Sequence, residues 1–378
     1  MKGLLAPFPS GSTAHCTPTP GTVTMKSGLR RFLIRVGRNW ALLFLILMLT
    51  YFSIFGLGFF SLKNYQNILV ASTTTLMLAA GETFVIITGG IDLSVGYVMG
   101  AATVIAALVM RDLYNSGVSE SLSILLGCLA GLFSGIIPGF INGFLIARLR
   151  VPPFIATLGM FGVAHGAGLI LSGGFPVVNL PPSLGFIGNG YIFYYLPEKG
   201  FSFLQRPEME RTEVRNLVGI IPIPAVIAAI VLIIFGFILA QTRFGQHTYA
   251  IGGNIDAALR AGIPVSRHLM IIYIISSMFA ALGGVLYVLR FTTGSSLAGE
   301  ARMLDSIAAV VIGGASLFGG TGNLKGTVIG TLIIATLETG LVILGVQPFY
   351  QFFAVGIIII IAVLIDQFFP EMIYEDES

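Results

Sequence analysis

Residues 242–263 read Thr242-Arg243-Phe244-Gly245-Gln246-His247-Thr248-Tyr249-Ala250-Ile251-Gly252-Gly253-Asn254-Ile255-Asp256-Ala257-Ala258-Leu259-Arg260-Ala261-Gly262-Ile263. They form a polar, helix-favouring segment between two long apolar runs. In so apolar a chain, a segment that meets neither lipid nor an obvious solute path needs a partner in water. The segment therefore predicts a docking element, and its partner is expected to supply the energy for whatever the apolar part moves.

The composition of the whole chain places it in a bilayer. Of its 378 residues, 55% are hydrophobic and 10% are charged, whereas soluble domains carry roughly 25% charged residues. The 48 glycines suit close packing of membrane helices, because small residues let two backbones approach each other. We therefore predict a polytopic membrane protein of the all-α class.

Length and apolarity of the hydrophobic runs predict about ten transmembrane helices. They are expected near 40–60, 67–88, 94–110, 121–147, 153–172, 218–240, 269–290, 304–319, 325–345 and 350–368. The chain is thus divided into a disordered, basic N-terminal segment (1–39), a transmembrane domain (40–368) and an acidic tail (369–378).

The basic residues set the orientation, since short cytoplasmic loops carry an excess of Lys and Arg. With the N-terminus inside, both termini are cytoplasmic. The inside segments then hold Lys2, Lys26, Arg30, Arg31, Arg35, Arg38, Arg148, Arg150, Arg243, Arg260, Arg267 and Lys325. The short outside loops hold Lys63, Arg111, Arg290 and Arg302. This topology places residues 241–268 in the cytoplasm and residues 173–217 in a long extracytoplasmic loop.

The long outside loop has two open interpretations. It contains Pro181-Pro182, the aromatic run Tyr191-Ile192-Phe193-Tyr194-Tyr195 and a stretch of mixed charge. A loop of this length is commonly functional, which favours a surface for an external partner. The same aromatic side chains would also suit a lip lying at the membrane interface.

Two glycine-rich breaks interrupt the apolar pattern. The first is Gly89-Gly90-Ile91-Asp92-Leu93-Ser94-Val95-Gly96, where Asp92 and Ser94 are suited to cap the following helix. It is either a gate or lining of a translocation path, or a tight capped turn that fixes two helices. The second break, residues 313–326, loosely resembles the first, and paired breaks of this kind are typical of transporters built from repeats.

The second break also contains Gly320-Thr321-Gly322 near Lys325, which superficially suggests a phosphate loop. The spacing fits neither GxxxxGK[ST] nor GxGxxG. We therefore expect no ATPase activity in this chain.

A few ionisable residues lie within the predicted spans, where a charge is costly and normally faces the bundle interior or a wet cavity. Glu82 is flanked by Thr83, and with a preceding run of threonines it would suit a path for a hydroxyl-rich solute; the alternative is a packing residue. Glu338 and His165 are better explained as packing residues. The path or gate candidates are Glu82, Thr83, Asp92, Ser94 and Asn142.

The sequence contains no pattern typical of an enzyme. The four histidines are scattered, HExxH and GxSxG are absent, and Cys16 and Cys128 match no metal or redox spacing. We predict no catalytic residues, no metal site, no bound cofactor and no nucleic-acid partner.

Within the docking segment, the residues from Ile255 to Ile263 are expected to form a short helix. Asn254 suits its N-cap, and Asp256 in the first turn is favoured by the helix dipole. Gly262 followed by Pro264 suits its end. Ala257, Ala258 and Ala261 would offer a small, smooth surface to a groove, with Arg260 available for an ion pair at the rim.

Several motifs together resemble the membrane permeases of ATP-binding-cassette (ABC) importers for monosaccharides, the ribose-type branch, which is distantly akin to branched-chain amino-acid permeases. The matching motifs are residues 89–96, Pro153-Phe154-Ile155-Ala156-Thr157-Leu158-Gly159-Met160, Thr242-Arg243-Phe244-Gly245, Ala250-Ile251-Gly252-Gly253-Asn254 through Ala261-Gly262-Ile263, and Ile312-Gly313-Gly314 with Gly319-Gly320. The resemblance covers about residues 40–368 and implies the fold of an ABC importer permease.

The resemblance also implies partners and a location. A separate ATPase subunit, often with two nucleotide-binding domains in one chain, would bind ATP. By this resemblance, the short helix of the docking segment would be the coupling helix, which sits in a groove of the ATPase. The residues of this chain that are expected to dock there are Gly253, Asn254, Ile255, Asp256, Ala257, Ala258, Arg260 and Gly262. A periplasmic or lipid-anchored sugar-binding protein would deliver the solute, a second permease copy or paralogue would complete the path, and membrane lipid would surround a multi-pass protein of the bacterial inner membrane.

Two other hypotheses stay open at this point. An ion- or proton-driven secondary carrier would move a small polar solute without an ATPase, although the spans offer few acids and histidines for a proton relay. A membrane scaffold or receptor would move no solute. The identity of the solute is open under every hypothesis.

Overall fold

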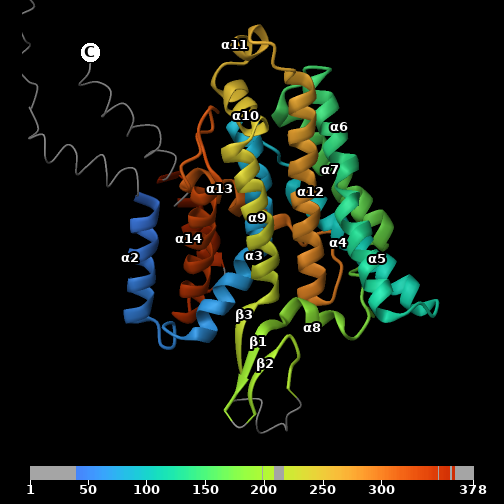
Figure 1. The fold of residues 1–378 in the computed structure, drawn as a ribbon, viewed down its shortest axis with the longest axis vertical. Helices are drawn as coiled ribbons and strands as arrows, with labels where there is room; N and C mark the ends of the chain where they lie inside the picture. The colour runs from blue at the N-terminus through green and yellow to red at the C-terminus, as the bar shows by residue number, and fades with distance from the viewer. Residues whose placement is uncertain (1–39, 198, 208–216, 348, 358–359, 362–378) are drawn as a thin grey trace, which may run out of the picture. The chain divides into compact units, whose positions relative to one another are not determined.

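The computed structural model describes residues 40–197, 199–207, 217–347, 349–357 and 360–361. The predictions for residues 1–39 and for the tail at 369–378 lie outside this range, as do residues 358–359 and 362–368 of the span predicted at 350–368. The helices are α2 (Trp40–Phe55), α3 (Leu62–Ile87), α4 (Val95–Asn115), α5 (Glu120–Ser134), α6 (Ile136–Ala147), α7 (Pro153–Ser172), α8 (Leu184–Asn189), α9 (Ile223–Gln241), α10 (Arg243–Gly253), α11 (Ile255–Arg260), α12 (Val265–Phe291), α13 (Glu300–Ile312) and α14 (Leu324–Ile343) (Figure 1).

Among the described residues, seven helical segments are long and apolar enough to cross a membrane. They are Leu62–Ile87, Val95–Asn115, Glu120–Ala147, Pro153–Ser172, Ile223–Gln241, Val265–Phe291 and Leu324–Ile343. Their burial differs sharply: the most apolar stretch of α3 is 89% buried, and that of α9 is 17% buried. Helix α3 therefore forms the centre of the bundle, whereas α9 turns most of its surface outward.

The predicted count of ten spans is not confirmed. Helix α2 has 16 residues and α13 has only 13, so α13 is about 20 Å long, well short of a bilayer's hydrocarbon core. The expected span at 304–319 is wrong because α13 ends at Ile312 and the chain turns at Gly314, which has a φ of 88°. At Gly313, a side chain would collide with the backbone of Gly326 at the start of α14.

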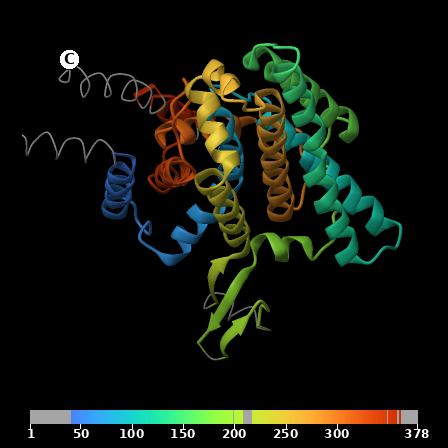
Figure 2. The same ribbon diagram turned by 45° about the horizontal axis from the view of Figure 1, so that its top comes forward.

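The all-α prediction also needs correction, because the segment predicted as an outside loop contains a three-stranded antiparallel sheet. Its strands are β1 (Tyr191–Leu196), β2 (Gly200–Phe203) and β3 (Val218–Pro222), in the order β2-β1-β3. Aromatic and β-branched residues favour extended backbone, and β3 takes the first five residues of the span expected at 218–240. In Figures 1 and 2 the sheet lies beyond the helices, at the end away from α11.

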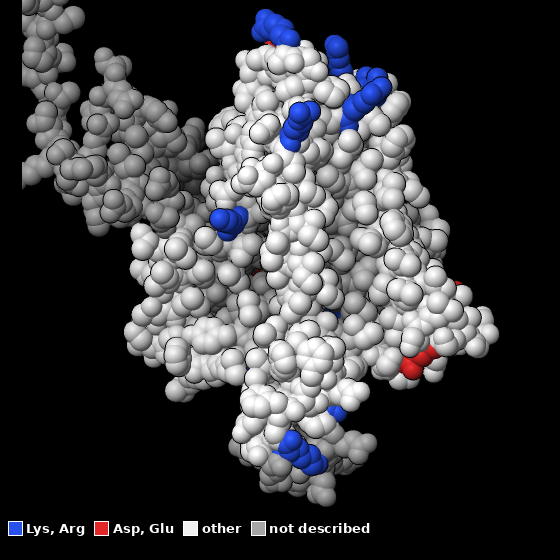
Figure 3. Space-filling view, in the orientation of Figure 1, with Lys and Arg blue, Asp and Glu red and all other residues white. Residues whose placement is uncertain are grey.

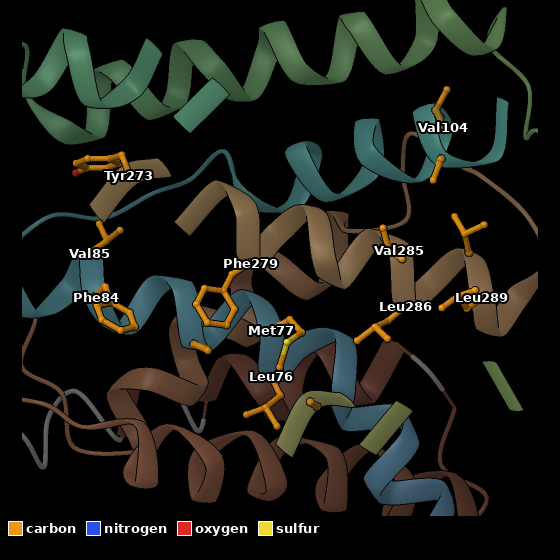
Figure 4. Packing of buried hydrophobic residues seen from close by; sticks show 14 of the residues in the cluster. Leu76, Met77, Phe84, Val85, Val104, Tyr273, Phe279, Val285, Leu286 and Leu289 are labelled. Carbon is orange, nitrogen blue, oxygen red and sulfur yellow. The ribbon is translucent and has the colours of Figure 1, made fainter. Parts of the chain in front are cut away.

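The core is formed by side chains between α3 and α12. Figure 4 shows Met77 and Phe84 of α3 beside Phe279 and Leu286 of α12, all of them buried. Glycines bring α6 close to the same helix: a Cβ at Gly139 would lie 2.6 Å from the Ile274 Cα. One at Gly143 would lie 2.8 Å from the Met270 Cα. This is the close helix packing that the glycine content predicted.

Candidate docking helix and buried polar cluster

Helix α11 lies at the end of the bundle away from the sheet and has the cap that the sequence predicted (Figure 1). The Oδ1 atom of Asn254 accepts a hydrogen bond from the N–H of Ala257 at 2.9 Å. Asp256 occupies the first turn and Arg260 the last, where the helix dipole favours a negative and a positive charge respectively. The helix ends at Arg260 rather than at Ile263, because Gly262 takes a left-handed φ of 81°.

The exposed surface of α11 contains only part of the expected alanine face. Ala258 is 3% exposed and packs against Ile251 and Val265 of its own chain, so it is not available to a partner. Ala257 and Ala261 are exposed, and the large apolar side chains that face outward are Ile255, 46% exposed, and Leu259, 55% exposed. Leu259 was missed at the sequence level, although its position one turn after Ile255 was a usable signal.

The two glycine-rich breaks meet directly beneath α11. The N–H of Gly320 donates to the carbonyl oxygen of Ile87 at 2.8 Å, which joins the second break to the end of α3. The Tyr249 hydroxyl of α10 donates to the carbonyl oxygen of Gly322 at 2.7 Å. A side chain at Gly252, two residues before Asn254, would collide with the Ile87 carbonyl oxygen. We call these contacts the glycine junction.

The glycine junction has no tolerance for added volume, because three backbones meet there without side chains between them. Tyr249 is partly buried, and burial raises the pKa of its hydroxyl above the ordinary tyrosine value. A groove of about 480 Å³ adjoins the junction and runs from Gly90 past Arg150 to Asp256 and Leu259. The first break and the docking helix therefore share one surface.

Asp92 is the centre of a fully buried polar cluster. Its Oδ1 atom accepts from the N–H of Ser94 at 3.0 Å and from the Ser94 hydroxyl at 2.5 Å. Its Oδ2 atom accepts from the hydroxyl of Ser276, on α12, at 3.1 Å. The side-chain amide of Asn142, on α6, donates to the Ser94 Oγ at 3.0 Å. The first break is thus tied to three helices: α4, α6 and α12.

The capping prediction for this break is wrong in its detail. Ser94 occupies the N-cap position of α4, but its side chain makes no capping hydrogen bond because it is engaged by Asp92 and Asn142. Burial raises the pKa of Asp92, and the hydrogen bonds from Ser94 and Ser276 counteract that rise. The turn is fixed by Asp92 rather than by a helix cap.

Glu82 belongs to the same cluster. Its Oε2 atom accepts from the N–H of Asp92 at 3.4 Å, and its Oε1 atom has no hydrogen-bond partner among the described residues. Glu82, Asp92, Ser94 and Asn142 are each 0% exposed. Four of the five path or gate candidates are therefore brought together, but they lie sealed inside the bundle rather than along an open path.

The fifth candidate, Thr83, lies apart from this cluster. Its hydroxyl is 2.7 Å from that of Thr327, which joins α3 to α14. Of the residues expected to serve packing, His165 lies against the ring of Tyr97, and Glu338 pairs with Arg302 at 3.0 Å. No local pattern predicted the pairing of Glu338 with Arg302, because the two residues are on different helices.

Comparison with known proteins decides the family. The family model for the permease component of the branched-chain amino acid transport system matches residues 64–363. The chain belongs to this family. This permease is 41% identical over 325 residues to the ribose import permease protein of Bacillus subtilis, with 85% of this chain and 90% of the relative covered.

Other relatives point to the same branch. The ribose import permease protein of Escherichia coli K12 is 34% identical, covering 86% of this chain and 92% of the relative. The D-allose transport system permease protein of Escherichia coli K12 is 33% identical, covering 82% and 85%. No solved structure matches the permease. The resemblance to ribose-type ABC importer permeases is confirmed, and the chain is a multi-pass permease subunit of an ABC importer.

Proposed function

We propose that this permease forms the translocation path for a monosaccharide in the bacterial inner membrane and is driven by a separate ATPase that docks on α11. The observation that carries the proposal is the attachment of α11. A short capped helix with Ile255 and Leu259 exposed is joined through Asn254 to the glycine junction, where α3 and the α13–α14 connection meet.

The junction supplies a route for mechanical coupling. The backbones of Gly252, Gly320 and Ile87 are in direct contact. A rigid-body displacement of α11 would therefore be transmitted to the end of α3, because no flexible side chain lies between them to absorb it. Helix α3 is followed by the first break, which Asp92 ties to α12 through Ser276. Closure of the ATPase on α11 would in this way tilt several membrane helices together. The helices would then act as one element with two positions, which is the kind of element that can couple two distant sites.

The charge distribution supports a cytoplasmic position for α11. Figure 3 shows Lys and Arg gathered at the end of the molecule that carries α11. The chain at this end, which includes the short helices α10 and α11 and the first turns of α12 and α14, contains Arg148, Arg150, Arg243, Arg260, Arg267 and Lys325. An excess of basic residues marks the cytoplasmic side, so the sheet is assigned to the outside.

The remaining partners follow from this arrangement. The sequence lacks both phosphate-loop spacings, so ATP would be bound by the ATPase subunit, in one tandem chain or two. A periplasmic or lipid-anchored binding protein would deliver the sugar on the side of the sheet. A second permease copy or paralogue would complete the path.

The substrate class is drawn from the relatives. Their names specify ribose, D-allose and galactose with methyl galactoside, which share a polyhydroxylated monosaccharide ring. We propose a monosaccharide of this kind for the permease.

Reconstitution tests the whole proposal. The permease is placed in liposomes with its ATPase and binding protein, and uptake of radiolabelled D-ribose, D-allose and D-galactose is measured with ATP or a non-hydrolysable analogue. We expect uptake of at least one sugar only with ATP and all components. ATP-independent uptake driven by an ion gradient, or no uptake of any of the sugars, would overturn the proposal.

A further inference from the structure

A cavity of about 510 Å³ lies at the sheet end of the bundle. Its walls come from the first turns of α3 and α13, the last turns of α14 and residues 351–355. The start of α3 is anchored to the sheet there, since the side-chain amide of Gln66 donates to the Gly219 carbonyl oxygen of β3. The volume falls within the roughly 300–1,000 Å³ typical of small-molecule sites. The docking and coupling mechanism does not use this cavity.

A cluster of three charged side chains opens onto the cavity. The Nη1 atom of Arg302 lies 3.0 Å from the Glu338 Oε2 and 3.5 Å from the Asp305 Oδ2. Arg302 and Glu338 remain 32% and 27% exposed, so neither is enclosed by the protein alone. Among the described residues, only Nη1 of the guanidinium makes hydrogen bonds, which leaves its other N–H groups free to donate to a ligand.

Neutral polar groups line the wall on α3 and the wall after α14. Asn67 is exposed on α3, lines the cavity and makes no side-chain hydrogen bond to a described residue. Gln351 lines the cavity as well, and its Nε2 atom makes only a long bond, 3.4 Å, to the Val346 carbonyl oxygen. Each amide offers a donor and an acceptor. Asn67 therefore presents an amide to the cavity that no described residue already occupies.

The rest of the wall is apolar. Phe352 is 68% exposed, and Val342 is 60% exposed. A monosaccharide ring presents hydroxyl groups, each a donor and an acceptor, around faces made of C–H groups. Carboxylates, a guanidinium and amides beside apolar side chains match both parts of such a ring. A plain ion pair holding α13 to α14 needs neither the amides nor the cavity.

We propose that this cavity is a monosaccharide-binding site of the permease itself, in which Arg302, Glu338 and Asn67 contact the sugar hydroxyls. The proposal rests on the proposed function, because it assigns a holding site for the same class of substrate on the side where the sugar enters.

Binding is tested on the full-length permease in lipid nanodiscs, without ATPase or binding protein. Saturation-transfer-difference NMR titrations use D-ribose, D-allose and D-galactose as probes. We expect saturable binding of at least one sugar. Asn67→Ala should weaken it roughly three- to tenfold, and Arg302→Gln by about tenfold or more, as loss of a neutral and of a charged hydrogen bond predicts.

The matched control is Asn115→Ala, which removes an exposed asparagine at the end of α4, away from the cavity. The Asn115→Ala variant should bind the sugar with the same affinity as the unmodified permease. If Arg302→Gln lowers the melting temperature, its weaker sugar binding could reflect a destabilised protein. The affinity of Asn67→Ala then decides the test, because this substitution breaks no described hydrogen bond. The proposal is overturned if no probe binds saturably, or if Asn67→Ala binds as tightly as Asn115→Ala.

The two proposals fail separately. ATP-driven uptake by the reconstituted transporter with unaltered binding by Asn67→Ala would remove the cavity site and leave the proposed function intact. Saturable binding that Asn67→Ala weakens, in a permease whose assembled transporter takes up no sugar, would support the cavity site and overturn the proposed function.

Discussion

The backbone N–H of Gly320 donates a hydrogen bond to the carbonyl oxygen of Ile87 at 2.8 Å, although the two residues are far apart along the chain. This bond joins the second break to the end of α3, two residues before the first break begins, and a Cβ at Gly319 would lie 2.9 Å from the backbone nitrogen of Gly89 in the first break. The breaks therefore form one structural unit, which neither break reveals when it is considered alone.

Replacing Gly252 with valine should uncouple the transporter. The added side chain meets the Ile87 carbonyl oxygen and the N–H of Gly320, so the junction must open. Overpacking of this kind costs about 1–3 kcal/mol, and we expect ATP-driven sugar uptake to fall roughly tenfold or more while membrane insertion is kept. The control is Gly236→Ala on α9, where the added Cβ has 4.0 Å of clearance. Normal uptake with Gly252→Val would show that the junction does not transmit motion.

Changes within α11 should separate docking from folding. Ala258→Pro removes the N–H that donates to the Asn254 carbonyl oxygen at 3.0 Å and costs about 3 kcal/mol in a helix interior. We expect the ATPase no longer to copurify with the permease. Leu259→Ser leaves the helix in place and removes only exposed apolar surface, so it should weaken ATPase binding without changing the melting temperature. Copurification of the ATPase with Ala258→Pro at the normal ratio would contradict docking on α11.

The orientation of α11 has a direct chemical test. In a permease with Cys16 and Cys128 replaced by serine, Ala257→Cys introduces an exposed thiol on α11. A membrane-impermeant maleimide should leave this thiol unlabelled in intact cells and label it in inverted membrane vesicles. A cysteine in the sheet, at the exposed Phe201, should give the opposite pattern. Labelling of Ala257→Cys from outside intact cells would reverse the proposed topology.

Asp92 should matter more for stability than Glu82. Asp92→Ala leaves Ser94 and Ser276 without their acceptor inside the bundle, which is expected to cost about 2–4 kcal/mol. Glu82→Gln keeps an oxygen to accept from the N–H of Asp92, so its cost should be below about 1 kcal/mol. Thermal melting in detergent measures both. Equal losses for the two variants would show that Glu82 contributes through its charge.

Local patterns predicted much of this permease, because its membrane helices are defined by length and apolarity. The α11 helix and its Asn254 cap were also predictable, since a cap is set by residues three positions apart. Helix α13 was misjudged because the run from 304 to 319 is apolar enough for a span. What ends it is the close approach of Gly313 to Gly326, and contacts between distant residues leave no periodic signal.

The candidate cluster was only partly predictable for the same reason. Glu82, Asp92, Ser94 and Asn142 stood out as polar residues in or next to apolar runs. Their hydrogen bonds to one another and to Ser276 depend on how α4, α6 and α12 cross. The sheet was not predicted because the aromatic residues of the loop suit a membrane interface as well as a β-strand.

Helix α3 touches both surfaces of the protein: Gln66 is bonded to the sheet at one end, and Ile87 is bonded to Gly320 at the other. Thermodynamic linkage makes such a connection reciprocal. If binding of an external protein on the sheet and binding of the ATPase on α11 both depend on the position of α3, each partner changes the affinity for the other by the same factor. Under the proposed function, binding of a sugar-loaded protein outside would then alter ATPase binding inside before any sugar has crossed.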